Sequence, residues 1–227
     1  MTAVFPNVPS VPDAHAHGTG APDDEVFRLW NVREPVSSVP DGIFFSAGIH
    51  PRDAGKYDLA AYETLFDSPR CLAIGECGLD RTADPPLPLQ MKVFEAQAGA
   101  AGRRGKPLLV HCVRCFPELL HVKAACAAGA AEWVVHGFRG AKRKAFDLLD
   151  AGFVLSFGAG LLRDAGNMDY FAEIPLDRIL LETDESPEFF GQILTEAAAM
   201  HLLAPSELAA AVRSNFKRIF HHDPFRT

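Results

Sequence analysis

Two histidines that could bind one metal ion, His15 and His17, stand in the short stretch Asp13-Ala14-His15-Ala16-His17. Side chains alternate between the two faces of a strand, so both imidazoles would project to the same side, about 6 to 7 Å apart along the backbone. At that spacing they could share one cation. A histidine pair on an apolar strand can also be purely structural, so the pair alone leaves both interpretations open.

Four further residues of metal-binding type each follow a later apolar run, where a buried strand would end: Glu76, His111, His136 and Asp184. A carboxylate has two oxygens, so one glutamate can bridge two cations. A lone histidine after an apolar run is often a hydrogen-bonded core residue, whereas a buried acid costs several kcal/mol unless it is paired or metal-bound. The repetition of one pattern at all these positions favours a metal centre over separate structural roles.

The composition is that of an ordinary globular protein, with 227 residues, 48% of them hydrophobic and 22% charged. We expect a single domain over residues 1–227. The net charge of -7 offers no general attraction for polyanions, so a nucleic-acid substrate would have to be held by a local basic cluster and by metal ions. The sequence contains no run of 18 apolar residues and no signal-peptide pattern, so we expect a cytoplasmic protein that does not bind membranes.

The five cysteines are an odd number, which argues against a disulfide framework. Cys112 and Cys115 form a CxxC pair, but neither a thioredoxin-like context nor a second pair of ligands accompanies it. We therefore expect buried or bystander thiols, and the role of this pair stays open.

Short apolar runs alternate with helical patterns along most of the chain. The predicted strands are 11–17, 26–32, 43–50, 71–75, 108–110, 133–135, 153–157 and 178–181. The predicted helices are 58–66, 87–104, 116–128, 141–149, 188–203 and 205–220. Ser206 is the candidate N-cap of the last helix. The first two connections between strands are too short for a crossover helix.

Parallel strands that are covered on both faces lose their polar alternation, so this pattern predicts a (β/α)8 barrel, with a doubly wound open sheet as the alternative. The candidate ligands follow the first, fourth, fifth, sixth and eighth strands, and only a closed barrel brings those ends to one point. The expected fold class is therefore α/β, a distorted TIM barrel whose outer helices are shortened or missing after the first two strands. That bare flank would be covered by the N-terminal segment, a C-terminal helix or a second subunit.

The order of motifs along the chain resembles the TatD family of metal-dependent hydrolases. The motifs are HxH at 15–17, GxHP at 48–51, GExGLD at 75–80, HC at 111–112, HGF at 136–138, LETD at 181–184 and the terminal NFKRIF at 215–220. The resemblance extends from Asp13 to Phe220. It implies an amidohydrolase-type barrel that hydrolyses phosphoester bonds in nucleic acids.

The same resemblance implies two divalent metal ions, with one bound by His15, His17, Glu76 and Asp184 and the other by Glu76, His111 and His136. Asp184 would act as the base for a metal-activated water, and Glu76 would bridge the metals. All of these donors are nitrogen or oxygen, which suits zinc, manganese or magnesium without choosing among them.

Three residues near the expected centre are candidates for binding the substrate. His50 could donate to a phosphate oxygen, or it could be a structural histidine before Pro51. Arg114 and Arg139 each stand three residues after a candidate ligand and could bind phosphate, or they could be solvated loop charges. Asp80 could orient a ligand or a substrate group, or cap a loop.

Three departures from the family's pattern concern the substrate. The segment Glu185 to Phe190 is acidic where relatives are basic, the first connections are short, and Arg139 stands where relatives usually have a small polar residue. The basic run 142–144 is expected to be a solvated helix face. The sequence therefore supports the metal centre more directly than it supports any one substrate.

Two enzymatic hypotheses follow. The first is a phosphoesterase or deoxyribonuclease whose substrate is DNA, nucleotide ends or a small phosphoester. The second is a small-molecule amidohydrolase, esterase or deacylase that uses the same binuclear centre. A catalytically silent scaffold is disfavoured because all six candidate ligands are intact. For the oligomeric state, a monomer and a homodimer are both compatible with the sequence.

Overall fold

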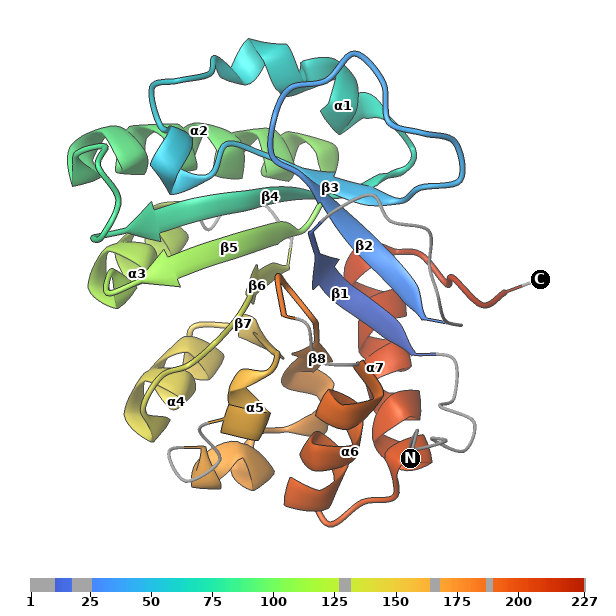
Figure 1. The fold of residues 1–227 in the computed structure, drawn as a ribbon. Coiled ribbons are helices and arrows are strands. Elements are labelled where there is room, and N and C mark those ends of the chain that lie inside the picture. The colour runs from blue at the N-terminus through green and yellow to red at the C-terminus, as the bar shows by residue number, and fades with distance from the viewer. Residues whose placement is uncertain (1–10, 18–25, 127–131, 164–167, 187–189, 227) are drawn as a thin grey trace.

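The structure, a computed structural model, describes residues 11–17, 26–126, 132–163, 168–186 and 190–226. Eight parallel strands lie side by side in chain order, each hydrogen-bonded to the next (Figure 1). They are β1 (Pro12–Ala16), β2 (Phe27–Val32), β3 (Phe45–Ala47), β4 (Cys71–Asp80), β5 (Leu108–Val113), β6 (Trp133–Val135), β7 (Phe153–Phe157) and β8 (Ile179–Leu181). This uninterrupted order confirms the predicted barrel and excludes the doubly wound sheet, in which the strand order reverses.

The barrel closes where the chain leaves β8 and meets β1. The Asp184 amide donates to the His15 carbonyl at 3.0 Å, and the His17 amide donates to the Asp184 carbonyl at 3.3 Å. These bonds form a parallel bridge between Ala16 and Asp184. The first and last candidate ligands in the sequence therefore become neighbours in space.

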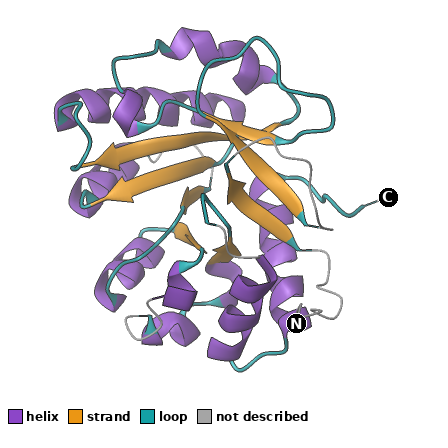
Figure 2. Cartoon of the chain, in the orientation of Figure 1, coloured by secondary structure: helices purple, strands orange, loops and turns teal. Residues whose placement is uncertain are grey.

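Helices lie around the outside of the strands (Figure 2). They are α1 (Glu63–Asp67), α2 (Leu87–Arg104), α3 (Phe116–Ala125), α4 (Lys142–Asp150), α5 (Gly160–Arg163), α6 (Phe190–Met200) and α7 (Pro205–Phe220). Short 3-10 segments add η1 (Pro51–Asp53), η2 (Leu59–Tyr62), η4 (Asp169–Glu173) and η5 (Leu176–Arg178). The chain between β2 and β3 forms no helix, as predicted, while most of the connection between β1 and β2 lies outside the described residues.

One helix start and one N-cap differ from the prediction. The segment predicted as a helix from residue 58 begins as the 3-10 helix η2, which Asp58 caps by accepting from the Ala60 amide at 3.1 Å. The prediction of Ser206 as an N-cap was wrong, because α7 begins at Pro205 and Ala204 is its N-cap. Proline at the first helical position fixes φ and lacks only an N–H that would have no helical partner.

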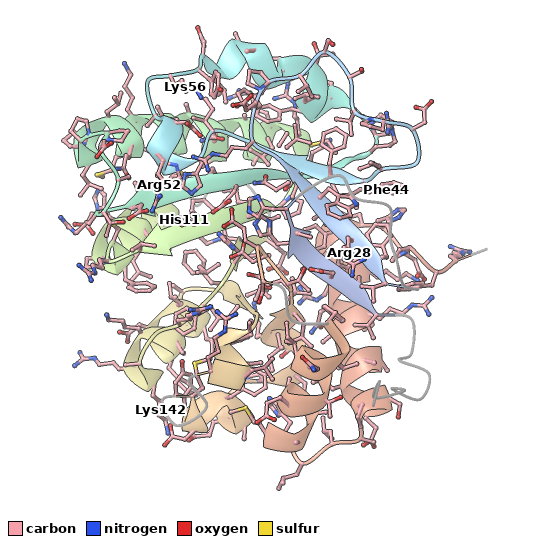
Figure 3. The ribbon with its side chains drawn as sticks, in the orientation of Figure 1. Arg28, Phe44, Arg52, Lys56, His111 and Lys142 are labelled. Carbon is pink, nitrogen blue, oxygen red and sulfur yellow. The ribbon has the colours of Figure 1, made fainter. Side chains whose placement is uncertain are left out.

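The flank of β1 and β2, which lacks helices of its own, is covered by the C-terminal part of the chain. The Phe27 ring packs edge-on against Phe216 of α7, with ring centroids 5.6 Å apart. His222 packs against both Phe27 and Phe44, at 5.6 and 4.2 Å between ring centroids. Figure 3 shows Phe44 on this side of the barrel, far from His111. Of the three predicted covers, the C-terminal helix is present, and the N-terminal segment 1–10 lies outside the described residues.

The core fills the space between the strands and the surrounding helices. Phe94 of α2, Trp133 of β6 and Phe153 of β7 are all buried, and their rings meet edge to face at 5.5 and 5.8 Å. Burying each such side chain contributes about 1.5 to 3 kcal/mol. Among the described residues, no helix is long and apolar enough to cross a membrane.

Candidate metal centre

Strand β4 positions Glu76, and it is longer than predicted. The predicted strand ended at residue 75, yet residues 78–80 continue to pair with 111–113 of β5, after a shift in register between Ile74 and Cys77. Glycine allows the two strands to approach, because a Cβ on Gly78 would lie 2.1 Å from the His111 carbonyl oxygen. Such irregularities re-aim side chains locally. Here the shift falls at Glu76, whose carboxylate faces the histidines of four other segments.

Four ligand atoms gather around one point at the mouth of the barrel. Glu76 Oε2 lies 3.7 Å from His15 Nε2 and 3.6 Å from His17 Nε2. Asp184 Oδ1 lies 3.6 and 3.3 Å from the same two nitrogens. Ligands of one tetrahedral zinc ion, with bonds of about 2.0 to 2.1 Å, are about 3.3 to 3.4 Å apart. The spacing of these atoms therefore fits a single shared cation.

The burial of His15 supports this interpretation. His15 is completely buried, and neither of its ring nitrogens has a hydrogen-bond partner among the described residues. A buried polar atom without a partner costs about 1 to 3 kcal/mol. A cation at the shared point would satisfy Nε2, so the residues present fit a metal ion.

A second group of imidazoles surrounds the other oxygen of Glu76. Oε1 lies 2.7 Å from His111 Nδ1 and 2.8 Å from His136 Nε2, and these two nitrogens are 3.4 Å apart. His50 Nε2 approaches the same oxygen to 3.3 Å. Glu76 thus presents one oxygen to each of two groups of histidines. The structure brings together all six residues that the sequence singled out as metal ligands.

Other polar groups hold these side chains from behind. Asn31 of β2 accepts from the Glu76 amide at 3.1 Å, and its own amide lies 3.4 Å from Glu76 Oε2. Asp80 Oδ2 lies 3.4 Å from His111 Nε2, and its Oδ1 caps the loop by accepting from the Thr82 amide at 2.8 Å. Both interpretations of Asp80 are therefore compatible with its contacts.

Asp13 joins β1 to the end of β8 beneath the candidate ligands. It accepts from the Thr183 amide at 3.1 Å and from the Thr183 hydroxyl at 2.6 Å. Burial raises the pKa of Asp13 to about 7, although the bonds from Thr183 oppose the rise. The link fixes the segment that carries His15 against the segment that carries Asp184.

Glu76 and His15 have protonation states that suit metal binding, and His136 does not. Burial raises the pKa of Glu76, but the charge of His136 and the hydrogen bonds with His111 and His136 bring it well below its ordinary value. Burial, reinforced by the charge of His136, lowers the pKa of His15 to about 4. Glu76 is therefore ionised and His15 neutral near pH 7, as metal ligands must be. Burial lowers the pKa of His136, but the charge of Glu76 and the hydrogen bonds with Glu182 and Glu76 bring it well above its ordinary value, so a metal ion there would have to displace a proton.

The cluster opens into a hollow of about 200 Å³. Its lining includes two arginines that the sequence did not single out, Arg33 and Arg52. Arg33 Nε donates to Asp53 Oδ2 at 2.6 Å, and Arg52 Nε lies 3.6 Å from Asp80 Oδ2. Figure 3 shows Arg52 beside His111. Each arginine is paired with an acid, and Glu185 lines the same hollow, so the rim offers guanidinium donors beside the candidate ligands without an excess of positive charge.

The other predicted substrate contacts lie in different places. His50 lines the hollow, and its Nδ1 also accepts from the Arg52 amide at 3.0 Å, so it is both a turn cap and a site residue. Arg139 lines a neighbouring hollow of about 200 Å³, which also reaches Asp184. Arg114 lines neither of the two and belongs to a third hollow between α3 and α4.

Several site residues escaped the sequence analysis. Asn31 and Glu182 carried a readable signal, because each is a polar residue inside or directly after an apolar run. Arg33 lies in a loop and Arg52 in the short 3-10 helix η1, where no periodicity indicates the direction of a side chain. Cys112 and Cys115 contribute nothing to the cluster, and burial raises the pKa of the Cys112 thiol to about 12.

An eight-stranded parallel barrel with histidines and carboxylates gathered at the carboxyl ends of its strands defines the class of metal-dependent barrel hydrolases. Residues 21–221 match the family described as TatD related DNase. The chain therefore belongs to this family.

Two relatives and one solved structure illustrate the match. A 3'-5' ssDNA/RNA exonuclease TatD from Edwardsiella piscicida is 32% identical over 156 residues, which are 66% of this chain and 60% of that protein. An uncharacterized metal-dependent hydrolase, YcfH, from Escherichia coli K12 is 29% identical over 203 residues, which are 82% of this chain and 77% of that protein. The crystal structure of YJJV, a TatD homologue from Escherichia coli K12, has a TM-score of 0.82 at 20% identity and covers 95% of this chain and 100% of that one, which supports the fold.

Proposed function

We propose that this chain hydrolyses phosphodiester bonds at the ends of single-stranded DNA or RNA, with two divalent cations bound at the candidate metal centre. The observation that carries the proposal is Glu76, whose two oxygens face separate groups of imidazoles at 2.7 to 3.7 Å. A carboxylate that offers one oxygen to each group could be shared by two cations, which would supply the two-metal chemistry that phosphoesterases use. The name of the exonuclease relative supports the substrate class.

The first cation would be held by His15, His17, Glu76 and Asp184, and the second by Glu76, His111 and His136. Zinc, manganese and magnesium are all candidates, and the four imidazoles favour zinc. When bound, such cations polarise phosphoryl oxygens and lower the pKa of water towards neutrality.

Asp184 is the group that would take and return the proton of the attacking water. Its Oδ1 faces His15 and His17, while its side chain is 41% exposed at the mouth of the barrel, within reach of solvent. Burial raises the pKa of Asp184, but the hydrogen bond with His17 and the charges of His136 and His15 bring it below its ordinary value. The carboxylate is thus ionised and able to accept a proton.

Three residues on the rim would bind the phosphate. His50 Nε2 points towards the metal centre, 3.3 Å from Glu76 Oε1, and would donate to a phosphoryl oxygen of the substrate. Arg33 and Arg52 line the same hollow, and their guanidinium groups would donate to the phosphate of the entering strand. At about 200 Å³ the hollow accommodates one nucleotide end rather than a duplex.

The test compares three kinds of substrate with manganese, zinc or magnesium present: a short single-stranded DNA, a generic phosphodiester, and a panel of esters and lactones. We expect the first two to be cleaved. Asp184→Asn should reduce their cleavage by about 10²- to 10⁴-fold. Asp150→Asn, at the exposed end of α4, is the matched control and should behave as the unaltered protein. Cleavage of esters or lactones alone, with no phosphodiester cleaved, would overturn the proposal in favour of a small-molecule hydrolase.

A further inference from the structure

A second hollow, larger than that of the metal centre, lies between α3 and α4. It has a volume of about 510 Å³, against about 200 Å³ for the hollow of the metal centre. Its apolar lining comes from Phe116, Pro117, Leu120 and Leu148. The hollow is therefore large enough for a planar, largely apolar group such as a nucleobase.

Positive charge surrounds this apolar lining. Arg114, Arg143 and Lys144 line the hollow together with a single acid, Asp147. Arg143 Nε lies 3.9 Å from Asp147 Oδ2, an exposed pair that leaves the other two cations uncompensated. A net positive site stands out in a chain whose net charge is -7. Because like charges are gathered here at an electrostatic cost, an anionic ligand would be stabilised.

One of the cations lies over the aromatic ring of the hollow. Lys144 Nζ lies 5.1 Å from the centroid of the Phe116 ring. Within the described part of the chain, neither Arg114 nor Lys144 forms a side-chain hydrogen bond or an ion pair. A ligand with a flat ring and a phosphate could therefore contact Phe116 and both cations without breaking an existing salt bridge.

The hollow lies on the same side of the barrel as the metal centre. Arg114 follows His111 by three residues, so their Cα atoms are at most about 10 Å apart. The first turns of α3 and α4, which line the hollow, follow the carboxyl ends of β5 and β6. A nucleic-acid strand covers such a distance in about three stacked nucleotides.

We propose that the hollow between α3 and α4 binds a nucleobase and its phosphate a few nucleotides from the bond that is cleaved. The base packs against Phe116 and the neighbouring apolar side chains, and Arg114 and Lys144 bind the backbone phosphates. Aromatic surfaces combined with a cationic groove are the usual way in which proteins bind single strands without sequence preference. This inference rests on the proposed function and names a second contact for the same substrate.

The experiment measures binding of a labelled ten-nucleotide thymidylate with an uncleavable phosphorothioate backbone, by fluorescence anisotropy, to the metal-loaded protein. Lys144→Gln should weaken binding about three- to tenfold and reduce the slope of log K against log salt by about 0.7. Lys142→Gln is the matched control, because Lys142 is an exposed lysine on the same helix that pairs with Glu173 outside the hollow. It should bind as the unaltered protein does.

A second variant tests the base contact separately from charge. Phe116→Leu keeps an apolar side chain and removes the aromatic face, so it should weaken binding of the thymidylate strand about fivefold or more and leave an abasic strand of the same length unaffected. Equal losses with both strands would indicate a general structural effect and would overturn the assignment of a base to this hollow.

The remaining outcomes separate this inference from the proposed function. Equal affinities of Lys144→Gln, Lys142→Gln and the unaltered protein would overturn the inference, and so would absence of binding. Failure of the proposed function would instead appear as an unaltered protein that cleaves no phosphodiester. Binding that depends on Lys144 in such a protein would leave the inference standing.

A two-nucleotide substrate, too short to reach the hollow, should be cleaved equally by Lys144→Gln and the unaltered protein.

Discussion

His136 Nδ1 lies 3.4 Å from Glu182 Oε1, on the side of the imidazole ring opposite the nitrogen that faces Glu76. Glu182 is completely buried. The Gly137 amide donates to its Oε1 at 2.6 Å, and the Ser156 hydroxyl donates to its Oε2. A carboxylate behind a metal-binding histidine fixes the tautomer and orientation of the ring and raises its basicity. The LETD motif thus supplies one candidate ligand, Asp184, and a buried carboxylate that lies behind another, at ion-pair distance rather than in a hydrogen bond.

The first prediction concerns this contact. Glu182→Gln keeps the shape of the side chain but removes its charge, so it should weaken metal binding about 10- to 100-fold. The measurement is a competition titration with a chelating dye, followed by kcat and KM at saturating metal. Glu173→Gln, an exposed glutamate that pairs with Lys142, is the matched control and should not alter metal affinity. Unchanged metal affinity in Glu182→Gln would show that its role is only to fill the core.

The second prediction concerns the bridging carboxylate. Glu76→Gln should lose most of the bound metal, because the amide replaces one carboxylate oxygen with an NH2 donor and removes the negative charge that the two groups of histidines share. Metal analysis should then give far less than two ions per chain, and activity should fall with it. The melting temperature supplies an independent check. A ligand at 100 times its Kd stabilises a protein by about 2.7 kcal/mol, so added zinc should raise the melting temperature of the unaltered protein but not that of Glu76→Gln.

The candidate ligands could be predicted from the sequence because the geometry of a barrel determines where the ends of its strands lie. Parallel strands in a closed barrel end at one mouth, so residues after successive apolar runs must meet there. This geometry alone is enough to predict that His15, His111 and Asp184 lie near one another. Gly75 and Gly78 accompany the register shift at Glu76, but glycine after an apolar run is also typical of a strand end, and the strand was predicted to end at residue 75 although it continues to Asp80.

The arginines that line the hollow of the metal centre were harder to predict, because they lie in the connections between strands. Arg114 follows a candidate ligand by three residues, which suggested a contact in the metal centre. It takes a left-handed backbone conformation with φ of 56°, and its side chain lines the hollow between α3 and α4 instead. Arg33 and Arg52 lie in connections without periodicity. Spacing along the sequence fixes the direction of a side chain in a strand but not in such loops.

The third prediction tests the rim of the metal centre. Arg52→Gln should raise KM for a generic phosphodiester about three- to tenfold and leave kcat nearly unchanged, because an exposed rim arginine binds the ground state and the transition state alike. Lys56→Gln is the control, since Lys56 lies in the same connection and pairs with Glu34 instead of lining the hollow. A fall in kcat with an unchanged KM would assign Arg52 to the chemical step.

The fourth prediction concerns the CxxC pair. Burial raises the pKa of Cys112 to about 12 and also raises that of Cys115, so both thiols should be protonated at pH 7.5. Because the thiolate is the reactive form, iodoacetamide should label both residues at least about tenfold more slowly in the folded protein than in denaturant. Peptide mapping after timed labelling gives the rates. Fast labelling of Cys112 in the folded state would argue for a redox or regulatory role.

The last prediction tests how the bare flank is covered. His222→Ala removes the ring that packs on Phe27 and Phe44, and should cost about 1 kcal/mol, or about 2 to 4 °C in melting temperature. Burial lowers the pKa of His222 from its ordinary value of 6.5, so the folded state favours the neutral ring. The contact's stabilisation is therefore fully present above pH 6.5 and is lost as the pH falls through the lowered pKa of the folded state. His222→Phe keeps an aromatic ring that cannot be protonated, and its melting temperature should depend less on pH between 5 and 7 than that of the unaltered protein. Identical pH dependence in the two would mean that protonation of His222 does not weaken this contact, and an unchanged melting temperature in His222→Ala would mean that its ring does not help to hold the C-terminal segment against β2 and β3.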